Sequence, residues 1–183
     1  MQTTRFELDV ARWEAAPTFA EWLPTAQKNA ELWQAVYRHA TIPDEIAARA
    51  RLLGGPWHLL ALSADWCGDA VNTVPVVQRL VDRVLGIDVR LLDRDGNPDI
   101  MDAHLTGKSR SIPVVMMFDA QFRELGWWGP RPGELQAWVL GPGRAMTSDD
   151  RYREIRRWYA RDHGRAALEE VVSMMERGAA AER

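Results

Sequence analysis

A short apolar run that passes through a turn into a long helical pattern indicates the fold class of this chain. Residues 57–63 are mostly apolar and are bounded by turn-forming residues, which predicts a buried strand. From residue 67 to residue 85 the valines recur mostly at three-residue intervals, which predicts a helix with one buried face. A strand that leads directly into a helix is typical of α/β proteins.

The same alternation continues through the middle of the chain. Apolar runs separated by turn residues follow the first helix, and a helical pattern comes between two of them. We therefore expect an α/β core in which helices flank a central sheet of about four strands. The further strands expected are 87–92, 113–118 and 122–128, and the further helices are about 98–105 and 133–140.

Helical patterns also lie on both sides of this core. Residues 1–16 show no clear period and are expected to be irregular or weakly extended. We expect a single domain, residues 1–183, with a core at about 54–142 and helical extensions at 1–53 and 143–183. The helices expected in the extensions are 26–40, 43–53, about 149–163 and 165–177.

Charge and composition indicate where the protein is located and which classes of partner are not expected. The net charge of −3 gives no reason to expect nucleic-acid or membrane binding, and no apolar run reaches the roughly 18 residues of a membrane span. The segment Met1–Val10 lacks the apolar stretch of a secretion signal. One cysteine cannot form an internal disulfide. Together these features predict a reducing, cytoplasmic location.

The lone cysteine, Cys67, stands at the junction of the first strand and its helix. Unpaired backbone N–H groups and the helix dipole at such a position favour the thiolate, which is the nucleophilic form of cysteine. The alternative is an inert buried cysteine, since free cysteines are often buried.

Five features along the chain carry a resemblance to a known family. They are the Trp66-Cys67-Gly68 turn, Pro75 inside the following helix, Asn97-Pro98 after the second strand, Ile112-Pro113 at the third strand, and Gly126 in the last strand. In type and order they resemble the thioredoxin family, over about residues 54–142. The resemblance implies a thioredoxin-like fold with a mixed sheet.

The resemblance also implies roles for particular residues. Cys67 would be the attacking thiol, and the groove that receives the substrate would be formed by Trp66, Gly68, Asp69, Ile112 and Pro113. The peptide bond between Ile112 and Pro113 is expected to be cis, as it is in the family.

A narrower resemblance rests on four short segments. They are Trp66-Cys67-Gly68-Asp69, Asn72-Thr73-Val74-Pro75, Leu92-Asp93-Arg94-Asp95 and Gly129-Pro130-Arg131-Pro132. They are similar to a bacterial branch of thioredoxin-like proteins that has helical extensions. Members of that branch often have Cys-Gly-Asp-Cys, whereas this chain has Ala70 at the fourth position.

The active-site turn departs from the family in ways that affect its chemistry. Ala70 replaces the second cysteine, which resolves mixed disulfides, and Ala61 stands where the family often has a buried acid. Asp65 and Asp69 place negative charge near the thiol and oppose the helix dipole, which raises the thiol pKa relative to a bare helix terminus. The sequence therefore predicts a modestly activated thiol.

Three hypotheses remain open for function. In the first, Cys67 is the nucleophile of a monothiol thiol-disulfide oxidoreductase, acting on a protein disulfide or a low-molecular-weight thiol such as glutathione, and an external thiol resolves the intermediate. In the second, the fold is a binding module that has lost turnover. In the third, Cys67 is inert. We expect no cofactor and no metal, because the four histidines lack metal-ligand spacing. The oligomeric state stays open.

Overall fold

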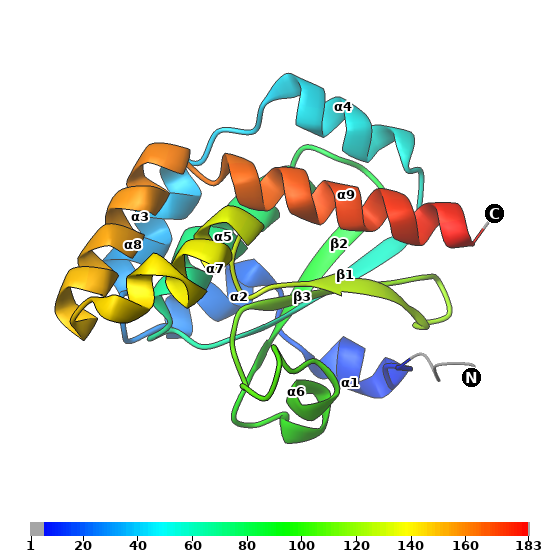
Figure 1. Cartoon of the computed structure of the whole chain (residues 1–183). Coiled ribbons are helices and arrows are strands. Elements are labelled where there is room, and N and C mark those ends of the chain that lie inside the picture. Colours follow the sequence, from blue (N-terminus) through cyan, green and yellow to red (C-terminus); the bar gives the residue numbers. More distant parts are fainter. Residues whose placement is uncertain (1–5, 183) are drawn as a thin grey trace.

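The computed structural model describes residues 6–182, and within this range the longer strands form one mixed sheet (Figure 1). Strand β1 pairs in parallel with β2 and antiparallel with β3, and β3 pairs antiparallel with β4. The predicted α/β class is thus confirmed. The strands are β1 (Trp57–Ser63), β2 (Ile87–Asp93), β3 (Val114–Phe118) and β4 (Glu124–Trp128), in the order β2-β1-β3-β4.

Helices precede the sheet, connect its strands and follow it. Short 3-10 turns lie at Leu23–Thr25 and Pro142–Ala145. No helix within residues 6–182 is long and apolar enough to cross a membrane. The helices are α1 (Val10–Ala15), α2 (Phe19–Trp22), α3 (Ala30–His39), α4 (Asp44–Leu52), α5 (Gly68–Val81), α6 (Pro98–Ala103), α7 (Gly133–Leu140), α8 (Ser148–Asp162) and α9 (Arg165–Ala181).

The expectation of an irregular or weakly extended segment at residues 1–16 is wrong for residues 10–15, which form α1. The carboxylate of Asp9 caps this helix by accepting a hydrogen bond from the backbone N–H of Ala11 at 2.8 Å. The buried side chain of Trp13 anchors the helix, with its ring 5.0 Å from that of His58. Residues 1–5 of the same prediction lie outside the described range.

The last strand begins at Glu124, two positions later than the predicted 122–128. The carboxylate of Asp119 causes this delay, because it accepts hydrogen bonds from the backbone N–H groups of Gln121 and Arg123, both at 2.9 Å. Phe122 adopts a φ of 59° inside the resulting turn. A side chain that satisfies turn N–H groups competes with the strand ladder.

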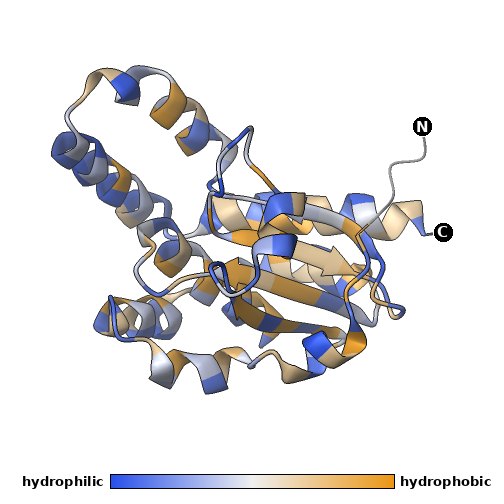
Figure 2. Cartoon of the chain, turned by 90° about the horizontal axis from the view of Figure 1, so that it is seen from below, coloured by the Kyte–Doolittle hydropathy of each residue, from blue (hydrophilic) through white to orange (hydrophobic). Residues whose placement is uncertain are grey.

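The sheet is covered on both faces, which places the apolar core around it. Figure 1 shows α4 and α9 above the sheet and α1 and α6 below it. All five residues of β3 are buried, as expected for a central strand with helices on both sides. In Figure 2 the central strands are mostly hydrophobic, while the surrounding helices carry hydrophilic faces. The main apolar cluster includes side chains from both extensions, such as Trp33 and Met175.

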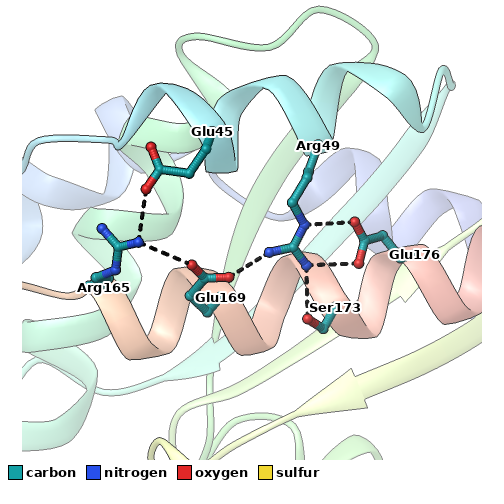
Figure 3. A network of polar contacts seen from close by, with 6 residues as sticks. All are labelled: Glu45, Arg49, Arg165, Glu169, Ser173 and Glu176. Carbon is teal, nitrogen blue, oxygen red and sulfur yellow. Dashed lines mark hydrogen bonds and ion pairs between the residues drawn. The ribbon is translucent and has the colours of Figure 1, made fainter.

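Arg49 on α4 joins the two extensions through the polar network in Figure 3. Its guanidinium donates to Glu176 at 2.8 Å, to Ser173 at 3.0 Å and to Glu169, all on α9. The hydrogen bond with Glu176 is the largest cause of the raised pKa of Arg49. Arg165 extends the network from α9 back to Glu45 on α4, at 2.8 Å.

Arg49→Met is expected to lower the free energy of unfolding by roughly 1 to 2 kcal/mol, since it removes several charge-assisted hydrogen bonds at once. The measurement is urea unfolding at low and high salt. Arg51→Met on the same helix is the control, because among residues 6–182 the Arg51 side chain makes only a 3.5 Å contact with the carbonyl of Arg83. Equal losses for the two variants would show that the network does not hold α9 in place.

Candidate active site

Cys67 lies at the junction predicted from the sequence, where β1 passes into α5. It is the N-cap residue of α5, and its backbone has an extended conformation with φ of −78° and ψ of 116°. Its Sγ donates a hydrogen bond to the carbonyl of Ile112 at 3.4 Å. The Ile112–Pro113 peptide bond is cis. The thiol is therefore placed against the loop that leads into β3.

Burial decides the proton affinity of this thiol. Cys67 is only 7% exposed, and burial is the largest cause of its raised pKa. The nearby charge of Asp69 raises the pKa further, while the backbone N–H groups of Ala70 and Asp69 and the charge of Arg131 oppose the shift. The expectation of a modestly activated thiol is wrong for this reason: the helix N-terminus is present, but the desolvation cost is larger.

Alkylation of Cys67 by iodoacetamide is expected to follow an apparent pKa above the ordinary thiol value of about 8.5. Asp69→Asn is expected to lower that apparent pKa, because it removes a negative charge close to the sulfur. The measurement is the alkylation rate as a function of pH, followed by mass spectrometry. An apparent pKa below the ordinary value in the wild-type protein would contradict this account of burial.

Asp69 is held in a buried cluster contributed by three parts of the chain. Arg131, which follows β4, places Nη2 at 2.7 Å from its carboxylate. The hydroxyl of Tyr159 on α8 donates to the same carboxylate at 3.0 Å. Burial is the largest cause of the raised pKa of Asp69, and the contacts with Arg131 and Tyr159 partly offset it. Burial and Asp69 likewise raise the pKa of Tyr159.

Asp65 connects the active-site turn to the N-terminal extension. Its carboxylate accepts hydrogen bonds from the backbone N–H groups of Gln27 and Lys28, both at 2.9 Å. Its carbonyl accepts from Trp33 Nε1 at 3.0 Å. The N-terminal extension is thus bound to the turn that carries Cys67, and the expectation that Asp65 opposes the helix dipole is not supported.

A cavity of about 550 Å³ opens beside the thiol. Of the residues predicted to form the site, Trp66, Cys67, Gly68, Asp69 and Ile112 line this cavity, whereas Pro113 is buried next to Ile112 and does not line it. Trp66 is 48% exposed and lies under the guanidinium of Arg94, 4.8 Å from the ring centroid.

Other residues of the site were not predicted. They include the arginines Arg94, Arg110, Arg131 and Arg156 and the tyrosines Tyr152 and Tyr159, all of which line the cavity. The arginine-rich helix at residues 148–162 and the segment around Arg131 are visible in the sequence, but nothing local indicates that they meet at Cys67. A second cavity of about 380 Å³ adjoins the first and shares Leu32, Asn72, Arg156 and Tyr159 with it.

Within the described residues, no cluster of three or more histidine, cysteine, aspartate or glutamate side chains is arranged to hold a metal ion. Asp69, the one carboxylate that lines the cavity, is already paired with Arg131.

Comparisons with known proteins agree with the fold. A comparison with curated proteins gives no match. Two solved structures share the fold: a protein of unknown function from Pseudomonas aeruginosa (TM-score 0.72, 18% identity) and an HIV epitope scaffold (TM-score 0.70, 17% identity). Each alignment covers 92% of this chain and 98% of the other. A family model described as Thioredoxin matches residues 16–161, and the chain therefore belongs to the thioredoxin family.

Proposed function

We propose that this protein is a monothiol thiol-disulfide exchange protein in which Cys67 is the nucleophile. The observation that carries the proposal is the position of its sulfur, at the N-terminus of α5, 3.4 Å from the Ile112 carbonyl and in the lining of the cavity. A disulfide bound in that cavity has its sulfur atoms next to Cys67. Trp66 and Ile112 also line the cavity.

The reaction needs two exchange steps. The Cys67 thiolate attacks one sulfur of the substrate disulfide, which forms a mixed disulfide and releases the other sulfur as a thiolate. An external thiolate then attacks the mixed disulfide and regenerates Cys67, with the substrate half leaving on the external thiol. Ala70 is fully buried and has no sulfur, so it leaves the second step to a small molecule or another protein.

The test follows mixed-disulfide formation directly. The protein is incubated with bis(2-hydroxyethyl) disulfide at several pH values, and the adduct is measured by mass spectrometry with and without added glutathione. We expect an adduct that forms faster as pH rises, because the raised pKa of Cys67 limits the thiolate. Glutathione is expected to remove it. Cys67→Ser is the control, and the absence of an adduct in the wild-type protein at every pH would refute the proposal.

A second candidate function is a binding module that uses the same groove without turnover. The raised pKa of the buried thiol and the presence of Ala70 favour it. Ala70→Cys separates the two candidates, because it restores the second thiol of the family at a position already inside α5. Insulin reduction by this variant, with none by Cys67→Ser, favours a site that retains exchange chemistry. No reduction favours the binding module.

The proposal extends to the finer relationship and the location. We place the chain in the bacterial branch that carries Trp-Cys-Gly-Asp and helical extensions, on the basis of its sequence segments. We also propose a reducing, cytoplasmic setting, since its lone cysteine then stays available for exchange. No nucleic-acid or membrane partner is part of the proposal.

A further inference from the structure

We propose that the cavity beside Cys67 selects low-molecular-weight disulfides that carry carboxylate groups. The inference rests on the proposed exchange function and names the substrate class of that site. The observation behind it is the charge of the cavity walls. They contain Arg94, Arg110, Arg131 and Arg156 against a single lining carboxylate, that of Asp69.

These arginines come from separate parts of the fold. Arg94 follows β2, Arg110 precedes the Ile112–Pro113 loop, Arg131 follows β4, and Arg156 belongs to α8. The whole chain is acidic, with a net charge of −3, so the positive lining is local to the site. A cavity lined by one sign of charge concentrates ligands of the opposite sign.

The arginines differ in how fully they are already neutralised. Arg131 is bound to Asp69 in the buried cluster and stays there. Arg94 pairs with Asp95 at 2.8 Å and Arg110 with Asp102 at 2.6 Å. Both of those carboxylates are more than half exposed, at 66% and 51%, and such pairs hold their partners weakly.

Among the four arginines that line the cavity, Arg156 is the one whose guanidinium has no partner within residues 6–182. Within residues 6–182 its side chain makes no ion pair or hydrogen bond, although its neighbours on the helix, Arg153 and Arg157, pair with Asp150 and Glu154. Arg156 also lines both cavities, at the place where they adjoin. A guanidinium is a planar donor that matches a carboxylate in a bidentate geometry.

The volume of the cavity and the residues that line it indicate a small substrate with both apolar and charged groups. A volume of about 550 Å³ falls in the range for small-molecule sites. Trp66 and Tyr152 supply apolar area beside the charged groups. A small disulfide with a carboxylate at each end fits this pattern: its sulfur atoms lie at Cys67 while one carboxylate binds Arg156. The exchange step itself is unchanged: a mixed disulfide forms, and the other half leaves as a thiolate that still carries its carboxylate.

The test uses three aliphatic disulfides that differ in charge. They are 3,3′-dithiodipropionate, which is dianionic, bis(2-hydroxyethyl) disulfide, which is neutral, and cystamine, which is dicationic. The rate of mixed-disulfide formation at Cys67 is divided by the rate of the same disulfide with 2-mercaptoethanol, which removes intrinsic differences in reactivity. We expect the dianion to exceed the dication by roughly tenfold or more at low salt. High salt is expected to reduce the ratio.

Arg156→Gln is expected to slow the reaction of 3,3′-dithiodipropionate relative to that of bis(2-hydroxyethyl) disulfide by roughly threefold or more. Because a change in the pKa of Cys67 alters both rates equally, the rate with the neutral disulfide serves as the internal reference. Arg153→Gln is the matched control, because it removes the same charge from the same helix outside the cavity lining. Equal rates for the three disulfides, or equal effects of the two variants, overturn the inference and leave the exchange function standing. If Cys67 reacts with none of the three, the proposed function fails, and the inference fails with it.

Discussion

Gly129→Ala is expected to lower the free energy of unfolding by roughly 3 kcal/mol or more, and to displace the loop that contacts Cys67. Gly129 has a φ of +144°, a conformation that side-chain-bearing residues rarely adopt. A Cβ placed there lies only 2.1 Å from the carbonyl oxygen of Pro113, which is backbone and has no rotamer to change. The substitution therefore forces the end of β4 away from Pro113.

The loop displacement has its own readout. The carbonyl of Ile112 accepts the hydrogen bond from the Cys67 thiol, so a shift of this loop is expected to increase the alkylation rate of Cys67 at a fixed pH. Gly54→Ala is the control, because Gly54 also has a positive φ, +73°, but a Cβ there meets no atom within 4 Å. It is expected to cost about 1 to 2 kcal/mol. Equal costs for the two variants would show that the contact with Pro113 contributes nothing.

Arg131→Met is expected to destabilise the protein by about 3 kcal/mol at neutral pH, because it leaves the buried carboxylate of Asp69 without its cation. The side chains of Arg131 and Asp69 are only 19% and 10% exposed, so water cannot replace the lost partner well. Arg110→Met is the comparison, since it breaks an exposed pair with Asp102 and is expected to cost less than about 1 kcal/mol. Urea unfolding measures both.

The effect of Arg131→Met is expected to depend on pH. Burial raises the pKa of Asp69, so the folded protein holds this proton more tightly than the unfolded chain does. The associated stability is complete below the ordinary aspartate pKa of about 4 and is lost as pH rises through the folded value. Without Arg131 that pKa rises further, so the loss should be larger at about pH 7.5 than at about pH 4.5. A loss that is equal at both values would contradict an ionised Asp69, and adding Asp69→Asn is expected to recover part of the stability.

Both extensions complete the site rather than merely enlarge the core. The N-terminal extension reaches the active-site turn through Trp33, and the C-terminal extension reaches Asp69 through Tyr159. Arg49 binds the two extensions to each other on the far side of the sheet from α1 and α6 (Figures 1 and 3). Substitutions of Trp33 or Tyr159 are thus expected to change the reactivity of Cys67.

The sequence by itself determined the elements of the core and the place of the thiol. Hydrophobic period and turn residues are local properties, so they predicted β1, α5 and the order of strands and helices, and they put Cys67 at a helix N-terminus. At β4, where the carboxylate of Asp119 competes with the strand ladder, the same reasoning placed the start two residues too early. It missed the helix α1, which Asp9 caps.

Only the tertiary structure decided how that thiol behaves. The residues that govern its charge are distant in sequence: the hydrogen bond from Tyr159 to Asp69 spans 90 positions, and that from Cys67 to Ile112 spans 45. The burial of Cys67 depends on which helices and strands pack over the site, and the hydrophobic periodicity of the local sequence does not predict it. The predicted activation by the helix N-terminus is real but smaller than the desolvation that this packing imposes. The arginines of the cavity come together only because four separate segments meet there.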